Sequence, residues 1–255
     1  MTYKEILIFD ISSEYGHFRK FNTTTSPLTY SIPTRTAVVG IIGAILGLER
    51  EISEGKFKEG TEPIQEKFSK KNADIAIQIL NPVKKVNIGF NLLNTKNSFF
   101  NIKNRTQIEF ELLKDAKFRI FIAIGDKNIF NELAEKIRNH KYHFSPYLGL
   151  SQFTLIADYI DIVNAEILEN IADEYIKINS VVNLSKTYGE NPVLFDYPDK
   201  NVSKKYASNI MPIEMDKERI IQEFSDVLIE KDGNQINTMV KEYCKVGDYG
   251  NILFL

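Results

Sequence analysis

A long loop near the N-terminus carries side chains that could recognise a nucleic acid. The candidates for RNA contact in this loop are His17, Arg19, Lys20, Thr29, Tyr30, Arg35 and Thr36. Arginine and lysine neutralise phosphates, and aromatic rings stack on unpaired bases. The loop ends where a helix is expected to begin, and a helix N-terminus offers free N–H groups and the positive end of a dipole to phosphate. This pattern indicates binding of a single-stranded nucleic acid.

A second basic segment lies at residues 84–105. It contains no acidic residue, and neither does the stretch 15–48 that includes the loop. The basic residues of the second segment are Lys84, Lys85, Lys96, Lys103 and Arg105. The whole chain has 34 acidic and 32 basic residues, so the rest of the protein is acidic. This polarity predicts a basic groove on an acidic body, and chance clustering of loop residues is the alternative.

Signatures of catalysis and metal binding are missing from the sequence. The histidines are His17, His140 and His143, and with the lone Cys244 they lack the spacing of a zinc site. The chain has no Walker phosphate loop, no GxGxxG after the first strand and no GxSxG elbow. We therefore expect no catalytic residue, no metal and no cofactor.

The composition is that of a globular protein from a reducing compartment. Hydrophobic residues make up 43% and charged residues 26% of the 255 positions, as in ordinary globular domains. No apolar run reaches the roughly 20 residues that crossing a bilayer requires, and no signal-peptide pattern is present. The single Cys244 cannot form an internal disulfide. We expect a cytoplasmic protein that does not bind membranes.

Regular elements must hold the loop and the second basic segment in place. Apolar runs predict strands at residues 4–11, 73–80, 107–113, 117–124 and 153–162. A turn at Lys114-Asp115 separates the third strand from the fourth. Thr34 is a good N-cap for an apolar helix that runs to about Leu48, and residues 127–139 predict an amphipathic helix.

Glycine and asparagine interrupt the apolar positions of residues 84–105. This pattern predicts a protruding hairpin with its tip near residues 94–97. The order of elements then predicts an α+β fold, namely a ferredoxin-like (RRM-like) βαββαβ domain with an inserted β-hairpin thumb. Strands at 175–185 and 251–255 and a helix at 216–230 would form a smaller, β-rich C-terminal lobe. We expect domains at 1–165 and 166–255, with the thumb at about 84–105.

Three glycines leave one side of the expected helix after Thr34 without bulk. They are Gly40, Gly43 and Gly47, at spacings of three and four. Glycine weakens a helix interior, so a close approach of another group is the expected reason for its use. Tight packing of the helix on the sheet is the simpler reading, and approach of a partner is the alternative.

The same loop and helix resemble the N-terminal signature of the CRISPR-associated protein family five, especially its type I-B branch. The matching segments are residues 6–11, Gly16-His17-Phe18-Arg19-Lys20, residues 26–33 and the helix with Gly40, Gly43 and Gly47. Further matches are Asn104-Arg105-Thr106-Gln107, residues 145–151, residues 211–215 and Arg219. The resemblance covers most of the chain, and its first 50 residues are the most specific part.

The resemblance implies a non-catalytic subunit that caps the repeat-derived 5′ handle of the CRISPR RNA in a type I antiviral interference complex (Cascade). It implies contacts with the family-seven backbone subunit through the thumb side, and with the family-eight large subunit. Target DNA would be met only indirectly, through the complex.

Two alternatives to this function stay open. One branch of the family, in type I-C systems, cuts precursor RNA with a Tyr-Lys-His set. Tyr30 lies where that tyrosine would fall, but no Lys-His pair follows the hairpin region. A metal-independent endoribonuclease using Tyr30 or His17 is therefore the first alternative. A protein-interaction scaffold that never touches RNA is the second.

Overall fold

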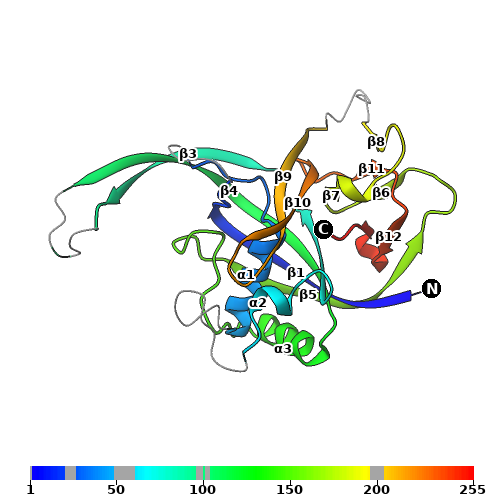
Figure 1. Ribbon diagram of the computed structural model, residues 1–255, viewed down its shortest axis with the longest axis horizontal. Coiled ribbons are helices and arrows are strands. Elements are labelled where there is room, and N and C mark those ends of the chain that lie inside the picture. Colours follow the sequence, from blue (N-terminus) through cyan, green and yellow to red (C-terminus); the bar gives the residue numbers. More distant parts are fainter. Residues whose placement is uncertain (1, 21–26, 49–60, 96–99, 101–103, 196–203) are drawn as a thin grey trace.

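One antiparallel sheet organises the fold (Figure 1). The computed structural model describes residues 2–20, 27–48, 61–95, 100, 104–195 and 204–255. The sheet has the strand order β13-β12-β5-β1-β4-β2, and β3 joins it by pairing with β4. Its strands are β1 (Thr2–Gly16), β2 (Ala73–Ile79), β3 (Lys84–Leu93), β4 (Arg105–Ile124), β5 (Ile156–Glu169), β12 (Glu242–Lys245) and β13 (Asn251–Ile252). The molecule is thus a mixed α/β fold dominated by strands.

Strand β1 pairs with β5 on one edge and with β4 on the other, and its middle is buried on both faces of the sheet. Its side chains alternate between two clusters of the core, as the two-residue period of a strand requires. Leu7 and Phe9 pack into the larger cluster, whereas Ile6 and Ile8 pack into the cluster on the other face. A segment buried on both faces must be largely apolar, which explains the unbroken hydrophobic run at residues 6–9.

Helices cover the face of the larger cluster, as Figure 1 shows. They are α1 (Arg35–Leu46), α2 (Ile64–Lys67) and α3 (Lys127–Arg138). The predicted N-cap is confirmed, because the Thr34 hydroxyl accepts a hydrogen bond of 3.1 Å from the Ala37 amide. The Asp126 carboxylate caps α3 in the same way. Neither helix is long and apolar enough to span a bilayer, nor is any other helix in the described ranges.

Two of the three helix glycines are explained by close neighbours. A Cβ atom on Gly43 would lie 2.0 Å from Ile64 Cδ1 of α2. Gly47 ends α1 in the left-handed region, with a φ of 80°, and His143 packs against it. Gly40 is different, because no neighbouring element among the described residues comes within 4 Å of the place its Cβ would take. The close approach is therefore to α2 and to the segment after α3, rather than to the sheet.

Strand β4 differs from the prediction. The turn expected at Lys114-Asp115 is wrong, because β4 continues from Arg105 to Ile124 without a break in the chain direction. Its first half pairs with β3 and its second half pairs with β1 and β2. Asp115 has a φ of 52°, so the polar pair predicted as a turn is a local irregularity inside a continuous strand. Strand β1 pairs with Lys114 before this residue and with Ala116 after it, and so keeps the direction of the strand.

The β3–β4 hairpin projects from the body of the molecule (Figure 1). Its register pairs Lys84 with Lys114 at the base and Leu93 with Arg105 at the outer end. The Asn94 amide donates to the Asn104 carbonyl at 3.0 Å, which closes the described part of the hairpin. Half of the expected tip, residues 96 and 97, lies outside the described residues, and so does Lys103.

The C-terminal part contains two small sheets. One small sheet has the order β7-β10-β9 and the other has the order β6-β11-β8. Their strands are β6 (Ile176–Ile178), β7 (Val182–Asn183), β8 (Val193–Leu194), β9 (Tyr206–Met215), β10 (Ile221–Glu230) and β11 (Ile236–Thr238). Two 3-10 turns, Leu184–Lys186 and Gly247–Tyr249, complete the described elements. The single strand predicted at 175–185 is therefore two strands in different sheets.

The helix predicted at 216–230 is wrong, because this segment is a turn followed by β10. Asp216 Oδ1 accepts hydrogen bonds from the amides of Glu218 and Ile220. An aspartate in such a turn gives the same local signal as a helix N-cap. The register of β10 against β9 also shifts twice, on either side of Glu223. These shifts break the two-residue alternation that would have identified a strand.

The expected division into 1–165 and 166–255 stays a prediction. Strand β5 extends from Ile156 to Glu169 and so crosses the expected boundary. Strand β12, from the C-terminal part, pairs with the end of β5. The main sheet therefore contains strands from both sides of that boundary.

Candidate nucleic-acid interface

The loop between β1 and α1 folds back on itself as a short antiparallel ladder. Arg19 and Thr29 face each other across an isolated bridge. The Tyr30 amide donates to the Phe18 carbonyl, and the Lys20 amide donates to the Leu28 carbonyl, each at 2.8 Å. A ladder sends alternate side chains to opposite sides. Phe18 and Tyr30 are buried, whereas Arg19 is exposed.

This loop lies against the base of the β3–β4 hairpin, and Glu111 of β4 joins the two. The Glu111 amide donates to the Pro27 carbonyl at 3.0 Å, and Glu111 Oε1 accepts from the Thr29 amide at 3.0 Å. Lys85 Nζ donates to the Thr29 carbonyl at 2.7 Å and to Glu111 Oε1 at 2.8 Å. The structure therefore places the two acid-free segments side by side.

Glu111 is the acidic residue that sequence reasoning missed. Burial by itself would raise the pKa of its carboxyl group, but hydrogen bonds from Lys85 and from the Thr29 amide outweigh burial, and the pKa is lowered. Glu111 therefore stays ionised and offsets part of the positive charge around it. No sequence signal marked it, because it lies 82 residues from Thr29 along the chain.

Cations still gather at this junction. The pKa of Lys20 is lowered, first by partial burial and then by repulsion from Lys85. Lys20 Nζ lies 5.9 Å from the centroid of the Tyr30 ring. Lys84 and Lys114 face each other directly across the hairpin base, and like charges in this position are destabilising. An anion near these ammonium groups would relieve their repulsion, and Lys114 is a second residue that sequence reasoning missed.

His17 is packed inside the junction. Only 3% of its surface is exposed, its Nδ1 lies 2.9 Å from the Glu111 carbonyl oxygen, and its ring meets the edge of Phe110. Burial lowers the pKa of its imidazole, so the ring is neutral near pH 7. A Cβ on Gly149 would lie 1.8 Å from the His17 carbonyl oxygen. The contacts that His17 makes with described residues therefore hold the loop against β4 and Gly149.

Thr29 and Tyr30 are also buried. The Thr29 hydroxyl donates to the Tyr30 carbonyl at 2.9 Å and accepts from the Phe18 amide at 2.8 Å. The Tyr30 hydroxyl donates to the Ile210 carbonyl of β9 at 3.0 Å. Both side chains thus connect the loop to itself and to the C-terminal part of the chain.

Arg35 is a buried clamp at the first turn of α1. It is 2% exposed, and its Nη2 donates to the carbonyls of Phe68 and Ala73 at 2.9 and 2.8 Å. Its Nη1 donates to the Ile213 carbonyl of β9 at 3.4 Å. Burial lowers the pKa of the guanidinium, although arginine remains charged in proteins. Thr36, next to it, is half-buried and shares a 2.9 Å contact with the Thr34 hydroxyl.

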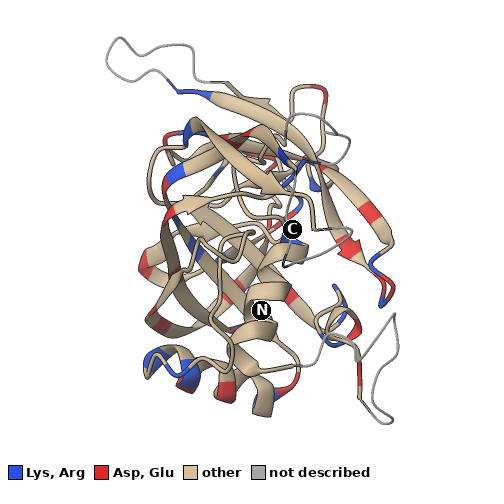
Figure 2. Ribbon diagram, turned by 90° about the vertical axis from the view of Figure 1, so that its left-hand side faces the viewer, with Lys and Arg blue, Asp and Glu red and all other residues tan. Residues whose placement is uncertain are grey.

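The remaining candidates lie on the hairpin. Lys84, Lys85 and Arg105 are exposed, and Arg105 begins β4 where the described hairpin ends. Figure 2 shows a basic position next to the undescribed tip, and it shows basic and acidic positions mixed over the rest of the ribbon. The structure therefore divides the predicted site residues into an exposed basic set and a buried set that shapes the junction.

Comparison with solved structures finds the same fold in CRISPR-associated proteins. A chain of a structure titled "CRISPR RNA-guided surveillance complex" is similar over 93% of this chain and 90% of its own, with 10% identity and a TM-score of 0.51. A CRISPR protein from Archaeoglobus fulgidus is similar over 96% of each chain, with 13% identity and a TM-score of 0.54. At these identities the likeness concerns the fold.

The sequence itself matches the profile of the family described as "CRISPR-associated protein (Cas_Cas5)" over residues 6–227. The chain therefore belongs to this family of CRISPR-associated proteins, as the loop and helix predicted. Comparison with curated protein sequences finds no significant match.

Proposed function

We propose that this protein binds the 5′ handle of a CRISPR RNA as the non-catalytic capping subunit of a type I interference complex. The observation that carries the proposal is the junction of the loop with the hairpin base. Two segments that are free of acidic residues, and far apart in sequence, meet there through Lys85, Thr29 and Glu111. Membership of the CRISPR-associated family supports a role in RNA-guided defence.

The fold supports the finer assignment. Strands β5, β1, β4 and β2 stand in the order of a ferredoxin-like sheet, with α1 and α3 as the two helices. We assign β3 and the first half of β4 as the thumb, and the two small sheets as the C-terminal lobe. We retain the type I-B branch from the signature in residues 16–33. The cytoplasm, where a guide RNA would be met, is the expected location.

RNA contact is assigned to the side chains that a phosphate backbone can reach. These are Arg19, Lys20, Thr36, Lys84, Lys85, Lys114 and Arg105. The buried set of His17, Thr29, Tyr30 and Arg35 holds the junction in shape, and we propose that these residues act as positioning residues. Lys96 and Lys103 stay predicted contacts on the hairpin tip. The family-seven and family-eight subunits are the proposed protein partners, and target DNA is met through the complex.

The contacts of Tyr30 and His17 support a function without RNA cleavage. A tyrosine that activates a 2′-hydroxyl must reach the RNA backbone. The Tyr30 hydroxyl already donates to a backbone carbonyl, and its ring is buried. His17 is buried on a carbonyl and an aromatic edge. Incubation of the purified protein with repeat RNA in EDTA tests this point, and single-site cutting that Tyr30→Phe abolishes would favour the endoribonuclease instead.

The binding proposal is tested by purifying the assembled complex and sequencing the RNA it retains. We expect a guide whose 5′ end is repeat-derived. In the isolated protein, Arg19→Glu should weaken binding of that handle about tenfold at low salt. It should also reduce the slope of log affinity against log salt by about one. Lys177→Glu, an exposed charge reversal on β6, is the matched control. Equal loss of RNA affinity in both variants would favour the protein-interaction scaffold. Failure of the protein to crosslink to RNA would also favour it.

A further inference from the structure

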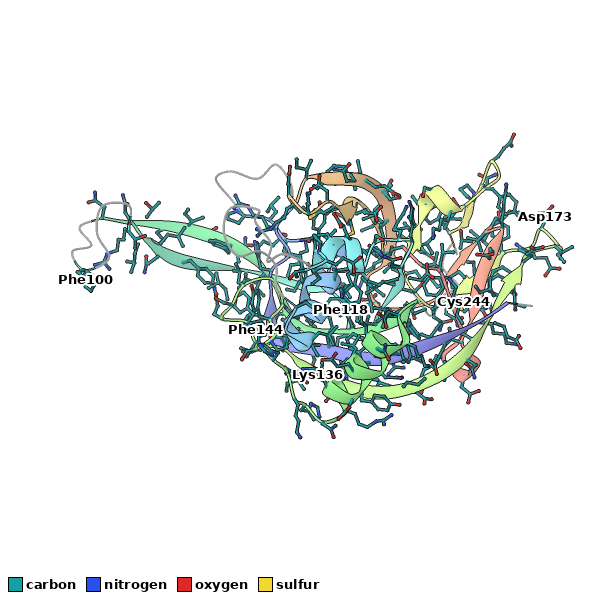
Figure 3. The ribbon with its side chains drawn as sticks, turned by 60° about the horizontal axis from the view of Figure 1, so that its bottom comes forward. Phe100, Phe118, Lys136, Phe144, Asp173 and Cys244 are labelled. Atoms are coloured by element: carbon teal, nitrogen blue, oxygen red, sulfur yellow. The ribbon has the colours of Figure 1, made fainter. Side chains whose placement is uncertain are left out.

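A row of three rings connects the loop between β1 and α1 to the β3–β4 hairpin. The hairpin extends from the body of the molecule toward Phe100 (Figure 3). The His17 ring packs against Phe110 of β4, with the ring centroids 5.3 Å apart. Phe110 in turn packs against Phe90 of β3, with the centroids 4.8 Å apart. His17 is therefore the residue of the loop that connects it to both strands of the hairpin through this row.

The hydrogen bond of His17 determines which ring nitrogen carries the proton. Nδ1 lies 2.9 Å from the carbonyl oxygen of Glu111. A carbonyl oxygen only accepts, so Nδ1 carries the hydrogen, and in the neutral ring Nε2 is an acceptor. Nε2 is buried and has no hydrogen-bond partner among the described residues. The contact with β4 thus uses one nitrogen of the ring and leaves the other without a partner.

A proton added to Nε2 would change this contact. It would turn Nε2 into a second donor and would give the ring a positive charge. The side chain is only 3% exposed, and no described group is in place to accept from Nε2. A buried charge and a buried donor without an acceptor are both costly. The packed position of the ring therefore suits the neutral imidazole and disfavours the imidazolium.

Charged groups on the neighbouring elements add to this preference. Arg19 of the loop and Lys85 of β3 repel a positive charge on His17, whereas Glu111 of β4 attracts it. The Glu111 carboxylate is already paired with Lys85 at 2.8 Å. Residues 145–151, which contact the His17 backbone, contain no charged residue. The repulsion by two cations is therefore opposed by one carboxylate that already has a partner.

The other contacts between the loop and the hairpin base do not involve a group that ordinarily titrates near neutral pH. The Glu111 amide donates to the Pro27 carbonyl. Thr29 is hydrogen-bonded to Glu111 Oε1 through its amide and to Lys85 through its carbonyl. Carboxylates and amines ordinarily titrate outside the range from about pH 5.5 to about pH 7.5, in which histidine ordinarily changes its charge. Among these contacts, the one made by His17 is thus the pH-sensitive contact.

We propose that neutral His17 holds the loop against the hairpin base and that protonation of His17 releases the loop. The inference rests on the function proposed above, because the loop and the hairpin base form the proposed handle site. Acidification should therefore weaken handle binding. An exposed histidine would have the opposite effect, since its added charge would strengthen the binding of a phosphate backbone.

The direction of the effect follows from proton binding. Burial is the main reason why the pKa of the His17 imidazole is lowered in the folded protein. The released ring therefore binds a proton more readily than the packed ring does. The stabilising contribution of the neutral contact is complete above the pKa of the released ring. It is lost as the pH falls from there toward the pKa of the packed ring.

The contact is tested first in the full-length wild-type protein, labelled with ¹⁵N in its histidines. The ¹⁵N shifts of an imidazole report which nitrogen carries the proton. We expect His17 to carry it on Nδ1 at neutral pH and to titrate below the ordinary value of histidine. A hydrogen on Nε2 at neutral pH, or an ordinary titration of His17, would overturn the proposal. This measurement does not depend on the folding of any variant.

Release of the loop is measured by amide hydrogen exchange at about pH 7.5 and about pH 5.5, with rates corrected for intrinsic exchange. We expect the protection of the Lys20, Thr29 and Tyr30 amides to fall about tenfold on acidification in the wild type. His17→Asn should abolish this dependence, because asparagine keeps a donor for the Glu111 carbonyl and does not titrate. His140→Asn changes an exposed histidine and should keep the wild-type behaviour.

Titration of repeat RNA against the same proteins, at fixed salt and at the same two pH values, tests the link to binding. We expect wild-type affinity to fall about threefold or more on acidification, because the competent fraction falls. Affinity and amide protection that respond to pH equally in the wild type and His17→Asn would overturn the pH-sensitive contact and leave the handle function standing. Loss of protection in the wild type alone, with no RNA binding at either pH, would overturn the handle function and keep the contact.

Discussion

The loop between β1 and α1 and the β3–β4 hairpin contain segments of similar composition, but their basic side chains differ in burial. The loop and residues 84–105 of the hairpin lack acidic residues, and both contain arginine or lysine. Where the loop enters α1, Arg35 is buried and donates to backbone carbonyls, whereas Lys84 and Arg105 on the hairpin are exposed. The basic side chains of the two acid-free segments are therefore compensated in different ways. A buried cation needs carbonyl partners, and an exposed cluster of cations needs an anion from outside the chain.

The largest effect is expected from the buried cation. Arg35→Ala removes a guanidinium that joins the end of α2, the start of β2 and β9. Loss of a buried charged donor set should lower the free energy of unfolding by about 3 kcal/mol or more. Urea denaturation followed by circular dichroism measures this change. If stability is unchanged while handle affinity falls, Arg35 is an RNA contact and the comparison between the two regions fails.

The next effect tests how firmly the loop is held at its start. Gly149 has a φ of 86°, and its Cβ would overlap the His17 carbonyl oxygen. Gly149→Ala should cost about 2 kcal/mol or more, since it combines backbone strain with displacement of the loop. Gly247→Ala is the matched control, because Gly247 also has a positive φ but no neighbouring atom of the described residues lies within 4 Å of its Cβ position. Equal melting temperatures for the two variants would show that this contact does not hold the loop.

A smaller effect, with opposite signs for folding and for binding, is expected at the junction itself. Glu111→Gln removes the negative charge that pairs with Lys85, a partly exposed ion pair. The free energy of unfolding should fall by about 1 kcal/mol or less, and RNA affinity should rise because the cations lose their internal counter-charge. Parallel denaturation and RNA titration measure the two quantities. A fall in both would mean that the shape of the junction matters more than its charge.

The same carboxylate predicts how stability depends on pH. The pKa of Glu111 is lower in the folded protein than its ordinary value. Its contribution to stability is therefore complete above the unfolded-state pKa and is lost as the pH falls through the folded-state pKa. The difference in unfolding free energy between wild type and Glu111→Gln should shrink on acidification. A difference that stays constant through the acidic range would exclude the ion pair as its cause.

The smallest effect on stability is expected on the hairpin. Lys84→Glu places a carboxylate opposite Lys114 and relieves a like-charge pair. Stability should therefore change by no more than about 0.5 kcal/mol and should rise rather than fall. Handle affinity should drop, with a shallower salt dependence. Retained affinity in Lys84→Glu would place the RNA away from the hairpin base.

Local signals in the sequence predicted the elements well where one physical cause dominated. The Thr34 cap, the apolar helix after it and the amphipathic helix at 127–139 each follow from a side chain or a period within one turn. The helix predicted at 216–230 was wrong because a capping aspartate gives the signal of a helix start and the irregular register hides the strand period. The turn predicted at Lys114-Asp115 was wrong because strands that are distant in sequence pair with β4 there and keep it continuous.

The site was harder to predict than the fold. Composition identified two acid-free segments that the structure brings together. It could not tell an exposed Arg19 from a buried Arg35, because burial depends on strands that come later in the chain. The contributions of Glu111 and Lys114 were invisible for the same reason. Gly40 was grouped with two glycines of the same helix, and only the positions of Ile64 and His143 separate them.

The length of β4 has a mechanical consequence. This strand has 20 residues and spans about 65 Å when extended. One end of the strand forms the hairpin, and the other end is held by hydrogen bonds between β1 and β2. Because the strand is continuous and fixed at one end, a force on the hairpin should rotate the whole protein and should not bend a flexible connection. If the strand bends under such a force, the bend should begin at Asp115, which has a left-handed backbone conformation.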